Sequence, residues 1–383
     1  MESNKKIKIA LFVPWIKSKG GVERAMLKIL EDGKYDTDVY TLFYDRKNTF
    51  DEFDRYGVIV LGNASPKGFM LRGLNLFKSI VFAKIKGLQD YDIFMISTAG
   101  IAEFITFRNR HKNTVAVCHT PLRVAHTMYG YYKGENTLNR ILLPVAARVY
   151  RMLEKAAWKR INYSLVFSEE VKKRLVDYGL ANSENIFNLG PHVNYSRIEK
   201  GAKTEKIIFY PSRFIKYKRQ DLAVRAFNLS RLPKEGFRLV LGGFAEDKDY
   251  FNSLKKMENE NVIVRENLSE NELNGFYREC YATLFLAVNE DTGLTPLESL
   301  AYGKPVISVN EGGPKEFIKD GVNGLLVDAD ENKIAEALNG ILDRPLYEKL
   351  VNGAENSERY DEERFMKKLD EAVSSILSAK VFK

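Results

Sequence analysis

The chain is poor in cysteine and contains no long apolar run. Its only cysteines are Cys118 and Cys280, too few for a disulfide framework or a cysteine-based metal site. Nowhere do about 18 apolar residues follow one another, so we expect no membrane-spanning helix. The first residues also lack the apolar stretch and small-residue cleavage site of a secretory signal. These absences predict a cytoplasmic protein.

The composition is that of a folded protein, and its charge is unevenly distributed. The 383 residues are 45% hydrophobic and 29% charged, which excludes a disordered chain and suggests two domains. The net charge is +8, but residues 1–195 carry +11 and residues 196–383 carry −3. The basic excess suits nucleic acid, an anionic membrane surface or an anionic substrate. A solvated basic face without a partner is the plainest alternative.

Strand-like and helix-like segments alternate in both halves. In the first half, a buried-type strand at 7–13, a glycine loop and an amphipathic helix at 22–30 are followed by predicted strands at 37–42, 58–61, 93–96 and 114–118. In the second half, a helix at 221–229 lies among predicted strands at 206–210, 237–241, 262–265, 282–287 and 305–309. This alternation predicts an α/β fold with two Rossmann-like, doubly wound parallel sheets.

The polar run after residue 195 marks the expected domain boundary. We expect an N-terminal domain at 1–195, a C-terminal domain at 196–360, and a terminal helix within 361–383 that packs back on the first domain. That helix carries Phe365, Leu369, Val373 and Ile376 at helical spacing. In such sheets ligands bind beyond the carboxyl ends of the strands. Two facing sheets would therefore share one interdomain cleft.

The segment 290–298 is the strongest functional motif. Gly293 allows a tight turn, and Pro296 suits a first helical turn. Backbone N–H groups of Gly293, Leu294 and Thr295 would then form an anion site at a helix N-terminus. Carboxylates stand on both sides of the turn, at Glu290 and Glu298, and can accept hydrogen bonds from sugar or ribose hydroxyls. The alternative is one capping carboxylate and one on the surface.

Two further segments follow predicted strands and suit phosphate. Residues 213–219 contain four cations, Arg213, Lys216, Lys218 and Arg219, a set that fits a diphosphate unless it is merely a solvated charge run. Gly20 and Gly21 precede a helix and would let a phosphate or sugar approach the backbone. A glycine pair is also common in plain turns, and this one lacks the spaced third glycine of the dinucleotide fingerprint.

Histidine is rare, which makes His119 conspicuous. The chain has four histidines, and His119 directly follows the strand at 114–118. There it can hydrogen-bond a substrate hydroxyl or a leaving oxygen, or it can be a satisfied structural histidine. Its neighbour Cys118 has no evident paired base, so we interpret it as a small buried hydrophobe.

Two basic segments of the first half could meet a membrane. Residues 66–89 contain five Lys and Arg and no acid before residue 90, interleaved with apolar side chains. A second basic stretch covers residues 140–160. Segments of this kind lie in a membrane interface or pack as ordinary helices with a cationic outer face.

Together these motifs resemble the GT4 family of retaining glycosyltransferases, which have the GT-B fold. The resemblance covers nearly the whole chain, from 20–24 to 321–327. Its most specific element is the E-x7-E pair Glu290 and Glu298, supported by Arg213-x4-Lys218 and by Gly312-Gly313-x2-Glu316. Residues 118–123 are similar to the subset that builds bacterial O-antigen, capsule or archaeal glycans, often with mannose.

The resemblance implies roles at the matching positions. Arg213 and Lys218 would hold the donor diphosphate, with the backbone of Gly293, Leu294 and Thr295 against sugar and phosphate. Glu298 would accept from the ribose and Glu290 from the donor sugar. The implied contacts from the first domain are Gly20 and Gly21 with the diphosphate and His119 with the donor sugar near its anomeric centre. The base would lie near 265–268, where the family often has glycine and this chain has Glu266.

The implied reaction is transfer of a hexose with retention, and the predicted catalytic residues are His119, Glu290, Arg213 and Lys218. Mannose from GDP-mannose is the first candidate donor and a UDP-hexose the second; the acceptor would be a glycan or a lipid-diphosphate-linked glycan. None of the motifs singled out above contains an Asp-x-Asp pair, so we expect no metal and no other cofactor. The location would be cytoplasmic, peripheral at the inner membrane face. Two alternatives are a GT-B sugar-nucleotide epimerase and a non-enzymatic basic binding protein; nucleic acid is not an expected partner.

Overall fold

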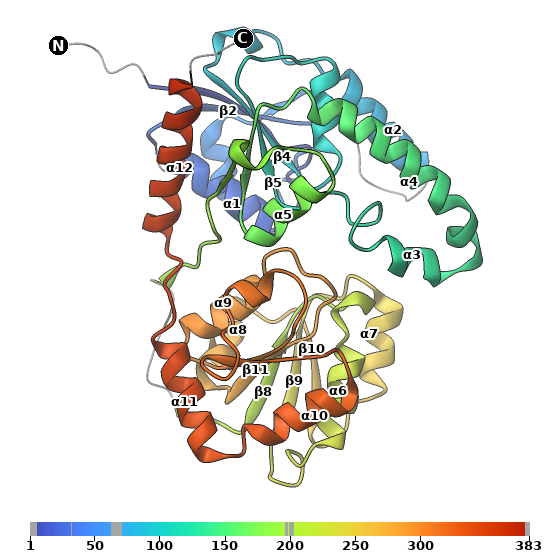
Figure 1. Ribbon diagram of the computed structural model, residues 1–383, viewed down its shortest axis with the longest axis vertical. Helices are drawn as coiled ribbons and strands as arrows, with labels where there is room; N and C mark the ends of the chain where they lie inside the picture. Colours follow the sequence, from blue (N-terminus) through green and yellow to red (C-terminus); the bar gives the residue numbers. More distant parts are fainter. Residues whose placement is uncertain (1–5, 32, 63–70, 196–197, 199–202, 380–383) are drawn as a thin grey trace, which may run out of the picture. The chain divides into compact units, whose positions relative to one another are not determined.

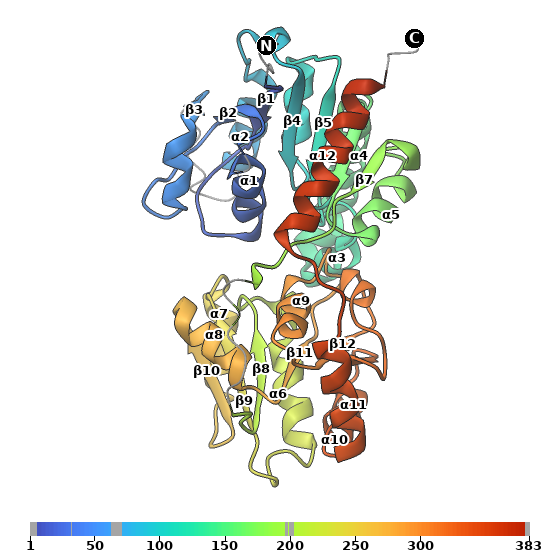
Figure 2. The ribbon, with the colours of Figure 1, turned by 90° about the vertical axis from the view of Figure 1, so that its left-hand side faces the viewer.

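The computed structural model describes residues 6–31, 33–62, 71–195, 198 and 203–379. Its contacts divide the chain into two compact units. Unit 1 comprises Met1–Gly190 together with Glu363–Lys383, and unit 2 comprises Pro191–Glu362. Figures 1 and 2 show that each unit is a sheet covered by helices on both faces. The predicted α/β class is confirmed.

Unit 1 contains a seven-stranded parallel sheet in the order β3-β2-β1-β4-β5-β6-β7. Every residue of β4 and β5 is buried, as expected for central strands covered on both faces. The predicted strands of this half are confirmed, whereas β6 and β7 were not predicted. The strands are β1 (Lys8–Phe12), β2 (Asp36–Thr41), β3 (Ile59–Val60), β4 (Ile93–Thr98), β5 (Thr114–Cys118), β6 (Tyr163–Val166) and β7 (Ile186–Asn188).

Several helices of unit 1 bury apolar faces in its core. In α1, the predicted apolar positions Ala25, Met26 and Ile29 lie in the core. Ser168 caps α5 by accepting a hydrogen bond from the Val171 N–H, at 3.2 Å. The helices are α1 (Gly21–Glu31), α2 (Leu71–Phe82), α3 (Tyr129–Glu135), α4 (Thr137–Trp158), α5 (Glu169–Asp177) and α12 (Glu362–Ser378), with the 3-10 turns η1 (Asp51–Tyr56), η2 (Leu88–Asp90), η3 (Ala102–Phe107) and η4 (Ser183–Asn185).

The terminal helix α12 belongs to unit 1 although it follows unit 2 in sequence. Its four spaced apolar residues, Phe365, Leu369, Val373 and Ile376, are at most 1% exposed and share a core cluster with β1, β4 and β5. On its rim, Asp370 accepts hydrogen bonds from Lys34 at 2.5 Å and from the Tyr35 hydroxyl at 2.6 Å. Figure 2 shows α12 running alongside the unit 1 strands. Unit 1 is therefore built from both ends of the chain.

Unit 2 contains a six-stranded parallel sheet in the order β10-β9-β8-β11-β12-β13. Its predicted strands are confirmed, and β13 was not predicted. The strands are β8 (Ile207–Pro211), β9 (Arg238–Gly243), β10 (Val262–Glu266), β11 (Ala282–Phe285), β12 (Val306–Val309) and β13 (Gly324–Val327). The helices are α6 (Gln220–Leu229), α7 (Lys248–Lys255), α8 (Glu270–Glu279), α9 (Leu294–Ala301), α10 (Glu331–Gly340) and α11 (Arg344–Glu355), with the 3-10 turns η6 (Lys216–Lys218) and η7 (Gly313–Glu316).

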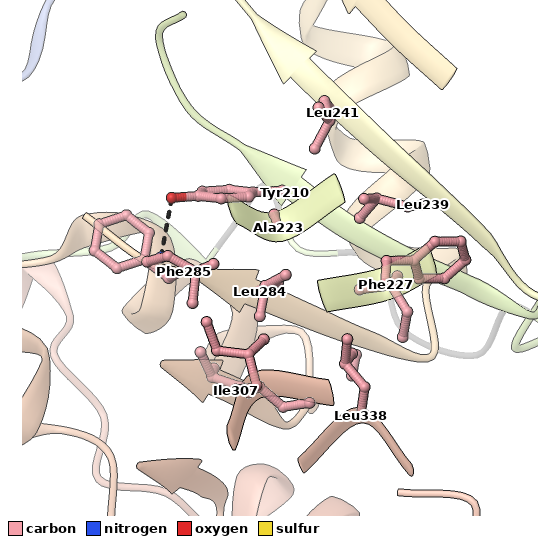
Figure 3. Close-up of a cluster of buried hydrophobic side chains, with 14 of the residues drawn as sticks. Tyr210, Ala223, Phe227, Leu239, Leu241, Leu284, Phe285, Ile307 and Leu338 are labelled. Carbon is pink, nitrogen blue, oxygen red and sulfur yellow. Dashed lines mark hydrogen bonds between the residues drawn. The ribbon is translucent and has the colours of Figure 1, made fainter. Parts of the chain in front are cut away.

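The unit 2 core contains one buried hydroxyl that ties two strand ends together. Figure 3 shows Tyr210 of β8 among apolar side chains of the sheet and of the helices α6 and α10. Its hydroxyl accepts a hydrogen bond from the Leu286 N–H at 2.9 Å and donates to the Lys218 carbonyl. Because a fully buried polar atom needs partners, these bonds fix the loop after β8 to the end of β11.

Each sheet reverses its strand order once. The reversal lies between β1 and β4 in unit 1 and between β8 and β11 in unit 2. At such a point the loops leaving two neighbouring strands diverge to opposite faces of the sheet, and ligands of doubly wound proteins bind in the gap they leave. Among the described helices, none combines the length and the apolarity needed to cross a membrane.

A buried polar network attaches α4 to unit 1. The Tyr150 hydroxyl donates to the Gly100 carbonyl and lies 3.1 Å from a carboxylate oxygen of Glu103 and 3.1 Å from one of Glu154. Glu154 also contacts the His126 ring, at 2.6 Å. One hydroxyl proton cannot serve three acceptors, so a protonated carboxyl is needed. Burial raises the pKa of Glu103 from 4.5 to about 7, which makes Glu103 that group.

Glu103→Gln should reduce the pH dependence of unit 1 stability. A carboxyl that binds its proton more tightly in the folded state makes unfolding easier as pH rises from about 4.5 to about 7, by up to about 3 kcal/mol. Between about pH 5 and pH 8 the wild-type unfolding free energy should therefore fall more than that of the variant. The facing groups Glu154 and His126 are unchanged in the variant.

The free energy of unfolding is measured in urea, with tryptophan fluorescence as the signal. Both tryptophans, Trp15 and Trp158, lie in unit 1 and report on that unit alone. The exposed Glu184→Gln is the matched control and should keep the wild-type slope. Equal slopes for wild type and Glu103→Gln would show that Glu103 is ionised in the folded protein throughout this range.

Candidate functional site

A buried ion pair joins the loops that follow β8 and β11 at the reversal point of the unit 2 sheet. The Lys218 Nζ lies 2.5 Å from the Glu290 Oε2, and the Lys218 side chain is only 8% exposed. The ammonium group also lies 5.2 Å from the centre of the Phe285 ring. A charge this buried requires a partner, and each member of the pair supplies it for the other. Two predicted site residues thus meet.

Glycines allow the loop after β12 to pack directly against the loop that carries Glu290. Gly312 has φ 66° and ψ −154°, a conformation open essentially to glycine alone. A Cβ atom there would lie 2.2 Å from the Glu290 carbonyl oxygen. The Gly313 N–H donates to that same oxygen at 2.9 Å. This packing explains physically why the Gly312-Gly313 pair accompanies the E-x7-E motif.

The helix α9 begins at the predicted turn. Gly293 precedes it with φ 89° and, having no side chain, leaves the first-turn N–H groups without a side-chain cap. Pro296 lies in the first turn as expected, and Leu294 is 39% exposed. The Thr295 hydroxyl donates to the Pro211 carbonyl at 3.3 Å, which ties the helix start to the end of β8. An anion site at these N–H groups stays a prediction.

The two carboxylates of the E-x7-E motif have different partners. Glu290 pairs with Lys218, whereas Glu298 accepts a hydrogen bond from the Tyr277 hydroxyl at 2.7 Å. Burial raises the pKa of Tyr277, so its hydroxyl stays protonated and donates. Tyr277 comes from α8, and nothing in the sequence singled it out. Glu298 is therefore held in place within unit 2 while remaining half-buried.

The cations after β8 divide into two kinds. Arg213 is 55% exposed and contacts Glu246 at 2.5 Å and the Tyr217 hydroxyl at 3.3 Å. Lys218 is buried in its pair with Glu290. Arg219, in contrast, contacts Glu311 at 3.0 Å and the Leu286 carbonyl at 3.2 Å, so it braces the loops around the site. All three of these cations thus bond to protein groups, and the role of the four cations toward a diphosphate stays a prediction.

Unit 2 therefore brings its predicted residues to one edge of its sheet. Hydrogen bonds between Lys218 and Glu290, Thr295 and Pro211, and Gly313 and Glu290 link the loops after β8, β11 and β12 at their carboxyl ends. Arg213, Gly293, Leu294 and Glu298 lie in the same loops or in the first turns of α9. Glu266 ends β10, two strands away from β8, and its side chain is exposed. Residue roles at this edge remain predictions.

In unit 1, His119 follows β5 and is held by both its backbone and its ring. Its N–H donates to the Thr98 carbonyl at 2.9 Å, and a hydrogen bond of 3.1 Å joins its Nε2 to the Ser97 hydroxyl. The ring stacks on Phe167, with centroids 5.0 Å apart, and Phe167 stacks in turn on Phe365 of α12. Removal from water lowers the pKa of His119 to about 4. The imidazole is consequently neutral near pH 7 and acts through hydrogen bonds.

The glycine pair after β1 is shaped by a glutamate that sequence reasoning overlooked. Gly21 begins α1, and a Cβ atom on Gly20 would lie 2.8 Å from a carboxylate oxygen of Glu23. Glu23 is itself buried and accepts a hydrogen bond from the Ser18 hydroxyl at 2.8 Å. A side chain on Gly20 would therefore have to displace the end of the Glu23 side chain. The position of Glu23, two residues after the start of α1, was the feature of the sequence that could have revealed this contact.

Neither cysteine chemistry nor a preformed metal cluster is found in the described part of the chain. Within residues 6–31, 33–62, 71–195, 198 and 203–379, no three His, Cys, Asp or Glu side chains are grouped to bind a metal ion. Cys118 is buried, as interpreted from the sequence. Burial raises the pKa of the Cys280 thiol to about 12, which leaves it unreactive.

Sequence comparison connects this geometry with a family. Residues 194–359 match the family model described as glycosyl transferases group 1. The chain is 23% identical to the alpha-1,3/1,6-mannosyltransferase ALG2 of Dictyostelium discoideum, across 98% of this chain and 100% of that protein. It is 24% identical to ALG2 of Mus musculus, across 94% of each chain.

Solved structures share the fold of the whole chain. The chain is similar to Alr3699/HepE of Anabaena in complex with UDP, with a TM-score of 0.72 at 18% identity, covering 96% of this chain and 100% of the other. Sucrose-phosphate synthase of Thermosynechococcus elongatus has a TM-score of 0.75 at 16% identity, covering 98% and 100%. The family match lies on the unit that carries the Lys218–Glu290 pair: residues 194–359 are a group 1 glycosyl transferase domain, and the whole chain has the GT-B fold.

Proposed function

We propose that this glycosyltransferase moves a hexose, with retention, from a nucleotide sugar bound by unit 2 to a glycan or a lipid-linked acceptor. The single observation that carries the proposal is the buried Lys218–Glu290 pair beside the uncapped start of α9. Cation, carboxylate and free N–H groups at one sheet edge match the three parts of such a donor, which are diphosphate, hydroxyls and leaving oxygen.

The proposed chemistry follows from the charge that develops on the leaving group. Breaking the bond between the anomeric carbon and phosphate leaves an extra negative charge on the diphosphate. Lys218, Arg213 and the first N–H groups of α9 would stabilise that charge, and such preorganised donors are worth a few kcal/mol each. Lys218 also neutralises Glu290, which allows this carboxylate to accept from sugar hydroxyls close to a diphosphate. Glu298 would accept from the ribose.

His119 would act in this scheme as a neutral hydrogen-bonding group. With its pKa lowered to about 4 by desolvation, it cannot supply a positive charge near pH 7. Its Nε2 is joined to Ser97, and Phe167 holds the plane of its ring. Such a fixed imidazole suits orientation of a sugar hydroxyl near the anomeric centre. An oxygen of the leaving phosphate would take the proton from the attacking acceptor hydroxyl, since retention by front-face attack requires no separate base.

Mannose from GDP-mannose is our first candidate donor and a UDP-hexose the second. ALG2 relatives are named as mannosyltransferases, and this supports mannose. UDP and UDP-glucose are bound in the similar HepE structures, which keeps the UDP-hexose alternative open. The +11 charge of residues 1–195 supports an acceptor on a lipid diphosphate and a peripheral location at the inner, cytoplasmic face of a membrane. No nucleic-acid partner is proposed.

A donor panel tests the proposed reaction. GDP-mannose, UDP-glucose and UDP-galactose are added separately, and the shift in unfolding temperature is measured. A donor at about 100 times its dissociation constant should stabilise the protein by about 2.7 kcal/mol. Product analysis of the stabilising donor without acceptor then separates the classes. Epimerised nucleotide sugar would make the protein an epimerase, and a panel without any shift would contradict donor binding.

Lys218→Met should lower the transfer rate at least about a hundredfold, by analogy with loss of one oxyanion donor. The exposed Lys216→Met removes a cation from the same segment and should remain near wild type. Circular dichroism and urea unfolding check that Lys218→Met folds, since it leaves Glu290 without its cation. A folded Lys218→Met enzyme with near-native turnover would remove Lys218 from the site.

We propose that transfer needs no metal ion, because cations and helix N–H groups would carry the stabilisation of the diphosphate. Incubation with EDTA, followed by assay with and without added Mg²⁺ or Mn²⁺, should leave the initial rate unchanged. Loss of turnover in EDTA and its recovery with either ion would show that a divalent cation does part of the work assigned to Lys218 and Arg213.

A further inference from the structure

The helix α4 exposes an apolar face. Seen as the long green helix in Figure 1, it has six large apolar side chains that are 48% to 67% exposed. At about 100° per residue these six positions fall within an arc of about 100°. They form one continuous strip, about 21 Å long, which we call the α4 stripe: Leu138, Ile141, Leu142, Val145, Val149 and Met152.

The inward face of α4 carries the polar groups instead. Tyr150 and Glu154 point into the buried network with Glu103 and His126. Beside them, Ala147, Ala157 and Trp158 are buried against the unit. A helix in a water-soluble protein ordinarily turns its apolar side inward and its polar side outward. Here the polar network already holds the helix, so the fold does not need the α4 stripe for its own core.

Charges of one sign border the α4 stripe. Four exposed residues of this helix and the turn after it are cationic: Arg140, Arg148, Lys155 and Lys159. The one acidic residue of α4, Glu154, is fully buried. By helical spacing, Arg148, Lys155 and Lys159 lie along one border of the stripe. The exposed surface of this helix is therefore apolar and positive, with no acid.

A basic depression lies at the C-terminal end of the α4 stripe. It is lined by Met152, Lys155, Ala156, Lys159 and Arg160. The Arg160 Nη1 is buried and finds no hydrogen-bond partner within the described part of the chain. Desolvation, and secondly the nearby Arg110 charge, lower the pKa of Arg160. Several cations without a paired acid in a small space fit an anionic phosphate group.

The segment 66–89 fits this role less well than the sequence indicated. Residues 63–70 lie outside the described residues, and the side chains of 71–74 are likewise not described. In the rest of α2, Phe77 and Ile80 pack into the unit 1 core, and Phe77 contacts Phe104 of η3. Phe82 alone among its described large apolar residues is strongly exposed, at 62%. Most of the described segment thus packs as an ordinary helix.

We propose that the α4 stripe and its cationic border dock on the interface of an anionic membrane. A long, narrow apolar strip beside like charges is the pattern of a helix that lies in a membrane surface. Antiparallel pairing of α4 with the same helix of a second copy would bring the rows of Arg148 and Lys155 toward each other, which repulsion disfavours. The proposal rests on the exposure of α4 and is independent of the donor and acceptor.

Vesicle sedimentation of the full chain tests the surface. Vesicles contain phosphatidylcholine alone or mixed with phosphatidylglycerol. The wild-type protein should pellet with the anionic vesicles, less so at high salt because screening weakens the cationic part. Two triple variants, Ile141→Asn/Val145→Asn/Met152→Asn and Arg148→Gln/Lys155→Gln/Lys159→Gln, should each bind at least about tenfold more weakly. The α5 double variant Val176→Asn/Lys173→Gln makes the same kinds of change elsewhere on unit 1 and should bind like wild type.

A fluorescent label supplies a second measurement, which does not depend on the stability of the triple variants. Both native cysteines are buried, so a polarity-sensitive dye on Val149→Cys reports on the α4 stripe and one on Val176→Cys on α5. Only the first should brighten and shift to the blue with anionic vesicles. Absence of wild-type pelleting on anionic vesicles, or an unchanged affinity of both folded triple variants, would overturn the proposal. So would a lipid-free dimer that dissociates in the asparagine variant, which would make the stripe a subunit interface.

Discussion

The arrangement of unit 2 depends on one buried ion pair at the point where its sheet reverses. The loop after β8, which carries Lys218, and the loop after β11, which carries Glu290, turn to opposite faces of the sheet. The charged groups of these two side chains lie 2.5 Å apart. A buried charge without its partner is costly, so the loops are stable together rather than singly. Tyr210 beneath them and Gly312 beside them fix the backbone positions from which the two side chains extend.

Unit 1 holds its candidate residue by a different principle. His119 is positioned by an aromatic stack through Phe167 to Phe365, the last of which comes from the far end of the sequence. The helix α12 that carries Phe365 is a full part of the unit 1 core. Residues that follow all of unit 2 therefore stabilise the surroundings of a histidine in unit 1. Unit 1 is therefore complete only when the chain has returned from unit 2.

The polar network and the α4 stripe lie on opposite sides of the same helix. A helix whose inner side carries Tyr150 and Glu154, in contact with Glu103 and His126, can be attached firmly without burying its aliphatic residues. The aliphatic side is then available for a partner. If that partner is a membrane, a glycosyltransferase would be held close to lipid-linked acceptors without a spanning segment.

Much of the fold follows from local pattern. The alternation of apolar strands and amphipathic helices gave both sheets, with errors of a few residues at most strand ends, because a strand buried on both faces must be continuously apolar. The strands β6, β7 and β13 escaped notice; each is only three or four residues long. The candidate residues Arg213, Lys218, Glu290, Gly293 and Glu298 were also evident, because glycine, cation and carboxylate follow strand ends at fixed spacing.

The tertiary structure decided which of these residues meet and what supports them. Nothing local distinguishes Arg219, which braces loops, from Lys218, which pairs with Glu290. Tyr277 and Tyr210 support the residues of unit 2 and Phe365 supports His119 in unit 1, in each case from a distant position in the sequence. A contact between distant residues leaves no periodic signal in the chain. The sequence alone determined the fold class and the chemical groups available. Only the packing of the chain determined the partners of those groups, because burial, and with it the strength of every charge and hydrogen bond, is a property of the folded whole.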